Sequence, residues 1–209
     1  MTFQNWWLFV TAVFLLSATP GPNMLHILSR SVLVGVRQTT IAMAGCLSAL
    51  CMILSASALG LTALLLAVPG AFEVLRYVGA AYLIFLGVKA WRTNEAPIDV
   101  GRVEPPRSMR GWRLFRGGFS IGISNPKSLL FAAAFLPQFV NSHAPKAPQF
   151  IVLVGTFLII ESFWYFVYAW GGRSISHYLE RPTISRIFNR VTGGIFVGFG
   201  IVLLKFREN

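Results

Sequence analysis

Apolar residues occur along this chain in long unbroken blocks, rather than in the alternation typical of half-buried strands. Six blocks have about the 20 residues that a helix needs to cross a bilayer. They cover approximately 6–29, 39–68, 72–91, 115–140, 150–172 and 188–206. We therefore predict an all-α membrane protein with six transmembrane helices.

One long polar segment divides these blocks into two groups of three. Residues 92–114 include "NEAPIDVGRVEPPRSMR", a polar, proline-bearing stretch typical of a linker. We predict a single transmembrane transporter domain with a first repeat at about 1–91, this cytoplasmic linker, and a second repeat at about 115–209. Because each half has an odd number of spans, the repeats lie upside down relative to each other, as in many secondary transporters.

Matches between the halves support this division. Pro22 precedes Pro126 by 104 positions, and Gly45 precedes Gly155 by 110. In a chain with 19 Gly and 18 Phe, such matches also arise by coincidence, so this observation supports the division without establishing it.

The fourth block, "ISNPKSLLFAAAFLPQF" (123–139), has three costly residues near its middle. Lys127 lies 11 residues after Arg116 and 14 before Asn141, or about 16 to 21 Å from either end of the span. A lysine at this depth costs about 2.5 to 3.5 kcal/mol, and a proline such as Pro126 inside a helix costs about 3 kcal/mol. The alternatives are an ordinary kink with a structural ion pair, or a functional break.

The first block favours the functional break. Its "SATPGPNML" (17–25) places Pro20, Gly21 and Pro22 near the middle of an apolar run, in the position equivalent to Pro126. Breaks in corresponding spans of two inverted halves are the best sequence indication of a transport site at the midplane. We therefore predict broken helices 1 and 4, with 20–23 and 125–127 meeting there.

Such breaks have a definite chemistry. Proline suits the first position of a helix, so Pro22 and Pro126 are each expected to open one. The free N–H groups of the helix N-termini then favour an anion, such as the carboxylate of a substrate. Asn23, Asn125 and Lys127 are candidate ligands beside them, and Phe131 is a candidate apolar wall.

The acid deepest in a span is Glu161, within "TFLIIESFWYFVYAW", beside Trp164 and Tyr168. We predict that Glu161 lies near Lys127 and the amino group of a substrate, with Trp164 against the substrate's side chain. A buried carboxyl group reached from either side of the membrane is also a candidate for proton coupling. The alternative is a core acid tied to Lys127 for structure alone.

Composition and charge agree with a membrane protein. Hydrophobic residues make up 55% of the chain, charged residues 12%, and the mean hydropathy is +0.65. The net charge of +11 then indicates basic loops at a membrane face rather than nucleic-acid binding. Twelve arginines follow the first, third and fifth spans, at 30, 37, 92, 102, 107, 110, 113, 116, 173, 181, 186 and 190. Since the cytoplasmic side keeps the excess of Lys and Arg, both termini are predicted outside, in the periplasm.

The motifs themselves resemble a known family. "TPGPNML" followed by "GVR" and "AGCLSAL", then "SNPKSLLFAAAFLPQFV" and "RYVGAAYLIFLGVKAWR", are similar to the LysE/RhtB amino-acid exporters over nearly the whole chain. The resemblance implies an inner-membrane carrier that expels amino acids or close derivatives in exchange for protons. It allows a homodimer, and it implies neither an enzyme nor a cofactor. Many members have an acid at the position of Leu50, and its replacement here favours a neutral substrate of the homoserine, threonine or leucine kind.

Two other functions of similar architecture were weighed. An intramembrane thiol-disulfide carrier needs cysteines that face each other across the halves, whereas Cys46 and Cys51 share one span. A metal-ion efflux protein needs a ligand set, and Met24 and His26 after the first break fall short of one. An amino-acid exporter is therefore the preferred interpretation.

Overall fold

The computed structural model describes residues 1–67, 71–92, 111–141, 144–179 and 182–205, and within them all regular structure is helical. This confirms the all-α class, while most of the predicted linker lies outside the described residues. The helices are α1 (Phe3–Ala18), α2 (Pro22–Val34), α3 (Val36–Ala67), α4 (Ala71–Arg92), α5 (Gly111–Ile123), α6 (Pro126–Leu130), η1 (Phe131–Phe135), η2 (Leu136–Phe139), α7 (Lys146–Leu179) and α8 (Pro182–Lys205).

Within the described residues, between two and four stretches are long and apolar enough to cross a membrane. Val36–Gly60 in α3 and Lys146–Gly172 in α7 qualify alone. Two bent pairs qualify when each is counted as one span: α1 with α2, bent by 51°, and α5 with Pro126–Phe139, bent by 52°. The interruptions predicted in the first and fourth spans are therefore present. α4 and α8 occupy the third and sixth predicted stretches, and the total of six spans stays a prediction.

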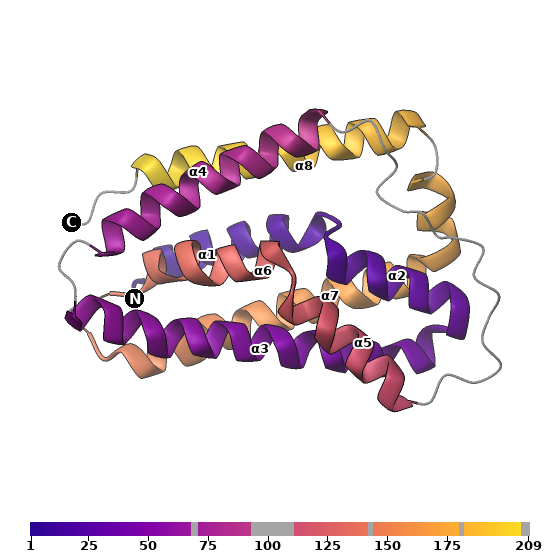
Figure 1. Cartoon of the computed structure of the whole chain (residues 1–209), viewed down its shortest axis with the longest axis horizontal. Helices are drawn as coiled ribbons and strands as arrows, with labels where there is room; N and C mark the ends of the chain where they lie inside the picture. Colours follow the sequence, from indigo (N-terminus) through magenta and orange to yellow (C-terminus); the bar gives the residue numbers. More distant parts are fainter. Residues whose placement is uncertain (68–70, 93–110, 142–143, 180–181, 206–209) are drawn as a thin grey trace.

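Glycines allow two helix pairs to pack with their backbones in contact. α4 and α8 lie side by side and run in opposite directions along one flank of the bundle (Figure 1), where a Cβ at Gly193 would lie 2.6 Å from the carbonyl oxygen of Gly87. α3 crosses α5 just as closely, because a Cβ at Gly118 would overlap the carbonyl oxygen of Ala42. Such small-residue contacts are typical of helices in membranes.

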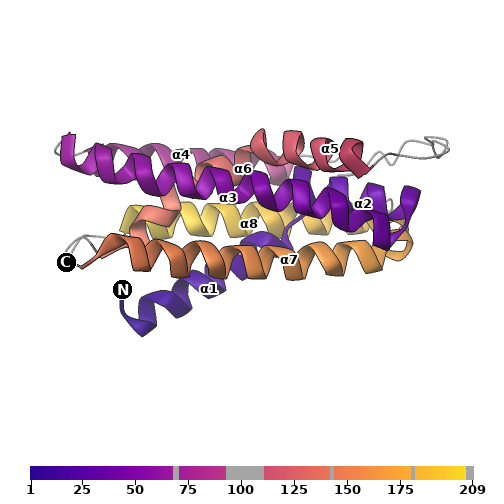
Figure 2. The same cartoon turned by 90° about the horizontal axis from the view of Figure 1, so that it is seen from below.

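The ends of the helices are sorted between the two ends of the bundle. The start of α1 and the end of α8 lie together, whereas α3 and α5 begin, and α2 and α7 end, at the opposite end (Figures 1 and 2). Arg30, Arg37, Arg113 and Arg116 belong to that opposite end. This sorting agrees with basic residues gathered on one membrane face, and which face is cytoplasmic stays a prediction.

The fourth predicted span is more irregular than a helix with one break. After the five residues of α6, the chain forms a π-helical turn (η1) and then a 3-10 turn (η2) that contains Pro137. The Ser57 hydroxyl of α3 donates a hydrogen bond to the carbonyl oxygen of Ala132 in η1. A neighbouring helix thus supplies a partner where the α-helical pattern is lost, as irregular backbone at membrane depth requires.

Candidate functional site

The first break separates α1 from α2 by three residues. Pro20 and Pro22 have no N–H group, so helical hydrogen bonding cannot continue through them. Thr19 closes α1 by donating from its backbone N and its hydroxyl to the carbonyl oxygen of Leu16, at 3.2 and 2.6 Å. Gly21 is the N-cap of α2 without a side-chain hydrogen bond, and Pro22 is its first residue. The expected start of a helix at Pro22 is confirmed.

The second break is shorter and has a side-chain cap. Asn125 is the N-cap of α6, and its Oδ1 accepts a hydrogen bond of 3.1 Å from the backbone N–H of Lys127. Pro126 is the first residue of α6, as predicted. Asn125 is buried, at 3% exposure. Its side chain therefore stabilises the helix start itself, a role different from the predicted contact with substrate.

The Lys127 side chain joins the two breaks. Its ammonium donates to the carbonyl oxygens of Leu16 and Thr19, at 2.7 and 2.9 Å, and to the Thr19 hydroxyl at 3.3 Å. A Cβ at Gly21 would lie 3.3 Å from Lys127 Cδ, so the lysine stem passes directly over that glycine. Residues 20–23 and 125–127 thus meet through Lys127. This ammonium thus holds carbonyl oxygens at the end of the first half-helix.

Glu161 faces the same place from the middle of α7. It is 3% exposed, and its carboxyl group lies against the hydroxyls of Ser17 and Tyr165. The Tyr165 hydroxyl in turn accepts a hydrogen bond of 3.0 Å from Asn23 Nδ2. Glu161 and Lys127 attract each other electrostatically, although the hydrogen bonds recorded for the ammonium go to α1. The pairing of this acid with this lysine stays a prediction.

Buried polar atoms without a hydrogen-bond partner gather at this point. In the part of the chain that the structure describes, they are Ser17 Oγ, Asn23 Oδ1, His26 Nε2, Glu161 Oε2 and Trp164 Nε1. All five lie on α1, α2 or the middle of α7. Leaving a buried polar group unpaired costs about 1 to 3 kcal/mol, and native proteins keep few of them. Three of the five atoms belong to Ser17, Asn23 and Glu161, whose side chains contact one another or Tyr165 at the first break.

A polar layer formed by Ser17, Asn23 and Glu161 separates two apolar cores. Along α7, Phe150, Leu153 and Phe157 belong to one core and Tyr165 and Tyr168 to the other, with Glu161 between them. The same division occurs along the first span, where Leu16 and Met24 belong to different cores. The largely apolar packing on both sides lowers the local dielectric, which strengthens electrostatic interactions within the layer.

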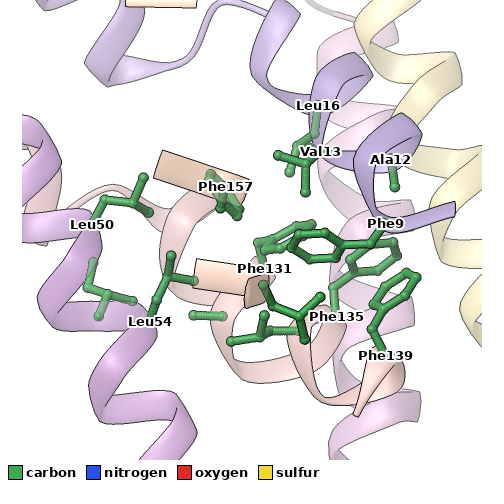
Figure 3. Packing of buried hydrophobic residues seen from close by; sticks show 14 of the residues in the cluster. Phe9, Ala12, Val13, Leu16, Leu50, Leu54, Phe131, Phe135, Phe139 and Phe157 are labelled. Carbon is green, nitrogen blue, oxygen red and sulfur yellow. The ribbon is translucent and has the colours of Figure 1, made fainter. Parts of the chain in front are cut away.

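Phe131 and Trp164 bound the layer from opposite cores. Phe131 stacks among phenylalanines of α1, η1 and α7 (Figure 3), with ring centroids 4.7 Å from Phe135 and 4.8 Å from Phe157. Trp164 packs against the other core, and its ring lies 5.1 Å from that of Phe14. The structure therefore places these two predicted site residues near the layer but not in one cluster.

Two hollows lie along the contact between α3 and α7. The smaller, of about 140 Å³, is lined by Met43, Leu47, Ser162 and Tyr165, and of these only Tyr165 belongs to the site. The larger, of about 740 Å³, is lined by apolar residues around Phe150 and Val154 and by Lys146. It shares no lining residue with the polar layer.

Sequence reasoning missed four residues of the site: Ser17, Thr19, Tyr165 and Tyr168. Tyr168 had been noted only as a neighbour of Glu161, yet its hydroxyl donates a 2.8 Å hydrogen bond to the carbonyl oxygen of Ala18. Tyr165 lies one helical turn after Glu161, so its position on the same face could have indicated it. Thr19, directly before Pro20, carries the signal of a residue that ends a helix.

Comparisons with known proteins agree with this geometry. A family model described as LysE type translocator matches residues 14–206. The homoserine/homoserine lactone efflux protein of Salmonella typhi is 31% identical over 208 residues, which cover 100% of both chains. The leucine efflux protein of Salmonella choleraesuis is 28% identical over 206 residues, covering 98% of this chain and 96% of the relative. No solved structure matches the chain.

Proposed function

This chain belongs to the LysE family of translocators, and we propose that it exports a neutral amino acid or a close derivative from the cytoplasm in exchange for protons. The proposal depends on one observation above the others. Unpartnered hydrogen-bond donors and acceptors, a buried carboxyl group and helix N-termini converge in one layer between two apolar cores. A zwitterionic amino acid has an ammonium group that can bind the acceptors of this layer and a carboxylate that can bind its donors.

The amino group of the substrate is assigned to the acceptors of the layer. Glu161 Oε2 and Asn23 Oδ1 are both buried and without a partner. An ammonium group has three donors and accepts nothing, so it can satisfy both oxygens at once. Hydrogen bonds to a charged group are worth about 1.5 to 3 kcal/mol, which offsets the desolvation of the ammonium.

The carboxylate of the substrate is assigned to the donors. Trp164 Nε1 lacks a partner, and the first backbone N–H groups of α2 have no acceptor within their own helix. The positive end of the α2 dipole points the same way. The ammonium of Lys127 adds attraction through space, since the three oxygens of Leu16 and Thr19 occupy its hydrogen bonds.

A neutral side chain suits the surroundings of this layer. Phe131 and Trp164 are proposed as its apolar walls, one from each core. Leu50 is fully buried in the first core, so that position offers no charge to a cationic side chain. The relatives' names, which refer to homoserine and leucine, support a neutral substrate.

We propose that six spans in two inverted halves carry this site across the inner membrane, with both termini in the periplasm. The matching bends of 51° and 52° in the first and fourth spans support the inverted arrangement. The shared position of the start of α1 and the end of α8 supports termini on one side (Figure 1). The arginines at the opposite end support a cytoplasmic location for that end.

Glu161 is proposed as the proton carrier. It is the described acid between the two cores, and alternating access would expose it to each side in turn. In that role it releases its proton to the cytoplasm when it binds the substrate's ammonium there, and it takes up a proton from the periplasm when the substrate leaves. A pH difference of one unit would then sustain about a tenfold concentration ratio of substrate for each proton exchanged.

Replacement of Glu161 by glutamine tests this role. In vesicles containing purified protein and labelled homoserine or leucine, the wild type is expected to build a substrate gradient from an imposed pH gradient. Glu161→Gln is expected to lose that gradient while still exchanging labelled for unlabelled substrate, because glutamine keeps the size but carries no exchangeable charge. Ser162→Ala, the adjacent residue on α7, serves as the control and should behave like wild type.

The outcomes separate the two parts of the proposal. Proton dependence that is unchanged in Glu161→Gln would exclude the coupling role. Wild-type vesicles that move no neutral amino acid under any gradient would exclude the export function itself.

A further inference from the structure

The Lys127 ammonium lies in an arrangement of oxygens that resembles a cation site. Its partners are the carbonyl oxygens of Leu16 and Thr19 and the hydroxyl of Thr19. All three oxygens come from two residues at the C-terminal end of α1, Leu16 and its C-cap Thr19. The lysine belongs to α6, 108 to 111 residues away in the chain. The first half of the protein therefore supplies the oxygens of the site, and the second half supplies the ammonium that binds them.

The physics of a helix end explains why this place attracts a cation. The carbonyl oxygen of Leu16 accepts from the N–H group and the hydroxyl of Thr19, whereas Pro20 and Pro22 offer no N–H donor to the carbonyl groups at the end of α1. The negative end of the helix dipole adds to their potential. In other secondary transporters, freed carbonyls at an interrupted helix coordinate a coupling cation such as Na⁺.

In this conformation, all three N–H donors of the Lys127 ammonium are used, and none remains for another ligand. A lysine has three N–H donors, and three oxygens lie within hydrogen-bond distance. Its stem is held against Gly21, where an added Cβ would lie 3.3 Å from Cδ. This geometry fits a group that orders the first break more closely than one that grips a substrate carboxylate.

We propose that the oxygens of Leu16 and Thr19 form a monovalent-cation site which this chain occupies with its own Lys127 ammonium in place of a free ion. The tethered ammonium holds the first break in shape, so the carrier needs no Na⁺ or K⁺ from solution. Tethering gives the ammonium an effective concentration in the millimolar range or above, and free cations compete poorly with it. The transport part of this inference rests on the proposed export function, whereas the binding part does not.

Removal of the ammonium should convert the site into one that a free cation can enter. The test uses purified Lys127→Ala in detergent, with methylammonium chloride as the first probe, sodium chloride as the second, and choline chloride as a cation too large for the site. At a methylammonium concentration ten times its Kd, the unfolding midpoint of Lys127→Ala should rise by roughly 3 to 5 °C relative to choline. The wild-type midpoint should not respond.

Two further variants sharpen this measurement. Lys146→Ala removes a lysine at the start of α7, away from the site, and should gain no response to methylammonium. Thr19→Val in the Lys127→Ala background removes one of the three oxygens and should weaken methylammonium binding by roughly tenfold. These controls separate a built site from a general effect of salt.

The same probe should restore function. In vesicles, Lys127→Ala is expected to lose export, and methylammonium should raise the remaining rate at least about tenfold. Sodium acting in its place would keep the inference and identify a smaller preferred ion. An equal response to choline, or none to any cation, would overturn it.

A folding defect leaves the test decisive. If Lys127→Ala does not accumulate, Lys127→Gln, which fills more of the space, takes its place. Failure of both variants to accumulate even when purified in methylammonium would also contradict the proposal, since the bound cation should support the fold. A wild type that exports nothing, with the thermal response of Lys127→Ala intact, would refute the export function and leave the cation site standing.

Discussion

The two breaks bend the chain by nearly the same angle, 51° in the first span and 52° in the fourth, yet they differ in chemistry. At the second break, the Asn125 side chain caps the new helix and its backbone N–H donates to the carbonyl oxygen of Gly122 at 3.2 Å. At the first break, Gly21 provides no side-chain cap, and Ser17 and Asn23 keep unpartnered atoms. The two breaks thus have nearly the same bend angle but different hydrogen bonding.

The two breaks therefore have different roles. The second break satisfies its own backbone and sends one side chain, Lys127, to the first. The first break depends on groups from elsewhere, namely Lys127 and Tyr168 for its carbonyl oxygens. A break that needs external partners is the one where a substrate can complete the hydrogen bonding. We therefore propose that the site is centred on the first break, whereas the sequence predicts a site shared by both breaks.

The helices next to the two breaks also differ in how closely they pack. The half-helix before the second break, α5, contacts α3 backbone to backbone, since a Cβ at Gly118 would overlap the Ala42 carbonyl oxygen. The half-helix after the first break, α2, contacts α7 through a side chain, since a Cβ at Gly172 would lie 2.9 Å from Ser31 Oγ. A hydroxyl can rotate away, whereas a backbone carbonyl cannot. The second break is thus fixed more rigidly than the first.

The largest expected effect comes from breaking that rigid contact. Gly118→Ala should force α5 and α3 apart, at a cost near or above the upper end of the roughly 1 to 3 kcal/mol for overpacking. Gly172→Ala should cost no more than the 2.8 Å hydrogen bond that the Ser31 hydroxyl donates to the carbonyl oxygen of Leu28, about 1 kcal/mol. Thermal unfolding of both variants in detergent measures the difference, at about 2 to 4 °C per kcal/mol. Equal losses would show that α2 is packed as rigidly as α5.

The next effect compares the two asparagines. Asn23→Ala removes an oxygen proposed to bind the substrate's ammonium and should lower the transport rate by roughly tenfold or more. Asn125→Ala removes a helix cap and should cost about 1 kcal/mol of stability while transport stays close to wild type. Initial rates of export, measured with unfolding midpoints on the same preparations, separate these effects. Equal loss of transport in both variants would contradict a site centred on the first break.

Much of this difference could not be predicted from the sequence. The breaks themselves could, because Pro20, Pro22 and Pro126 interrupt helical hydrogen bonding wherever they occur. The pairing of Lys127 with Leu16 and Thr19 could not, because backbone oxygens have no signature in the sequence and the partners lie more than 100 residues apart. The charged partner that the sequence indicates for that lysine is Glu161.

The irregular end of the fourth span shows a second limit. "FAAAFLPQF" (131–139) is apolar, and its three alanines favour an α-helix up to Pro137, which interrupts helical hydrogen bonding. The structure has a π-helical turn and a 3-10 turn there. Their hydrogen bonding depends on neighbours such as Ser57 of α3, 75 residues away. Composition predicts that such a segment is buried, whereas tertiary contacts decide its helix type.

The smallest expected effect concerns Gly21, the residue on which the Lys127 stem lies. Its φ of −120° and ψ of −178° are extended values open to any residue, so Gly21→Ala introduces no backbone strain. The new Cβ would lie 3.3 Å from Lys127 Cδ, and the flexible stem can shift by a few tenths of an ångström. We expect Gly21→Ala to lower transport by no more than about threefold. Gly21→Val adds two methyl groups at the same point and should lower it much further by displacing the ammonium from Leu16 and Thr19. Export rates of the two variants, measured beside wild type, test whether the first break depends on where Lys127 lies, and full activity in Gly21→Val would show that it does not.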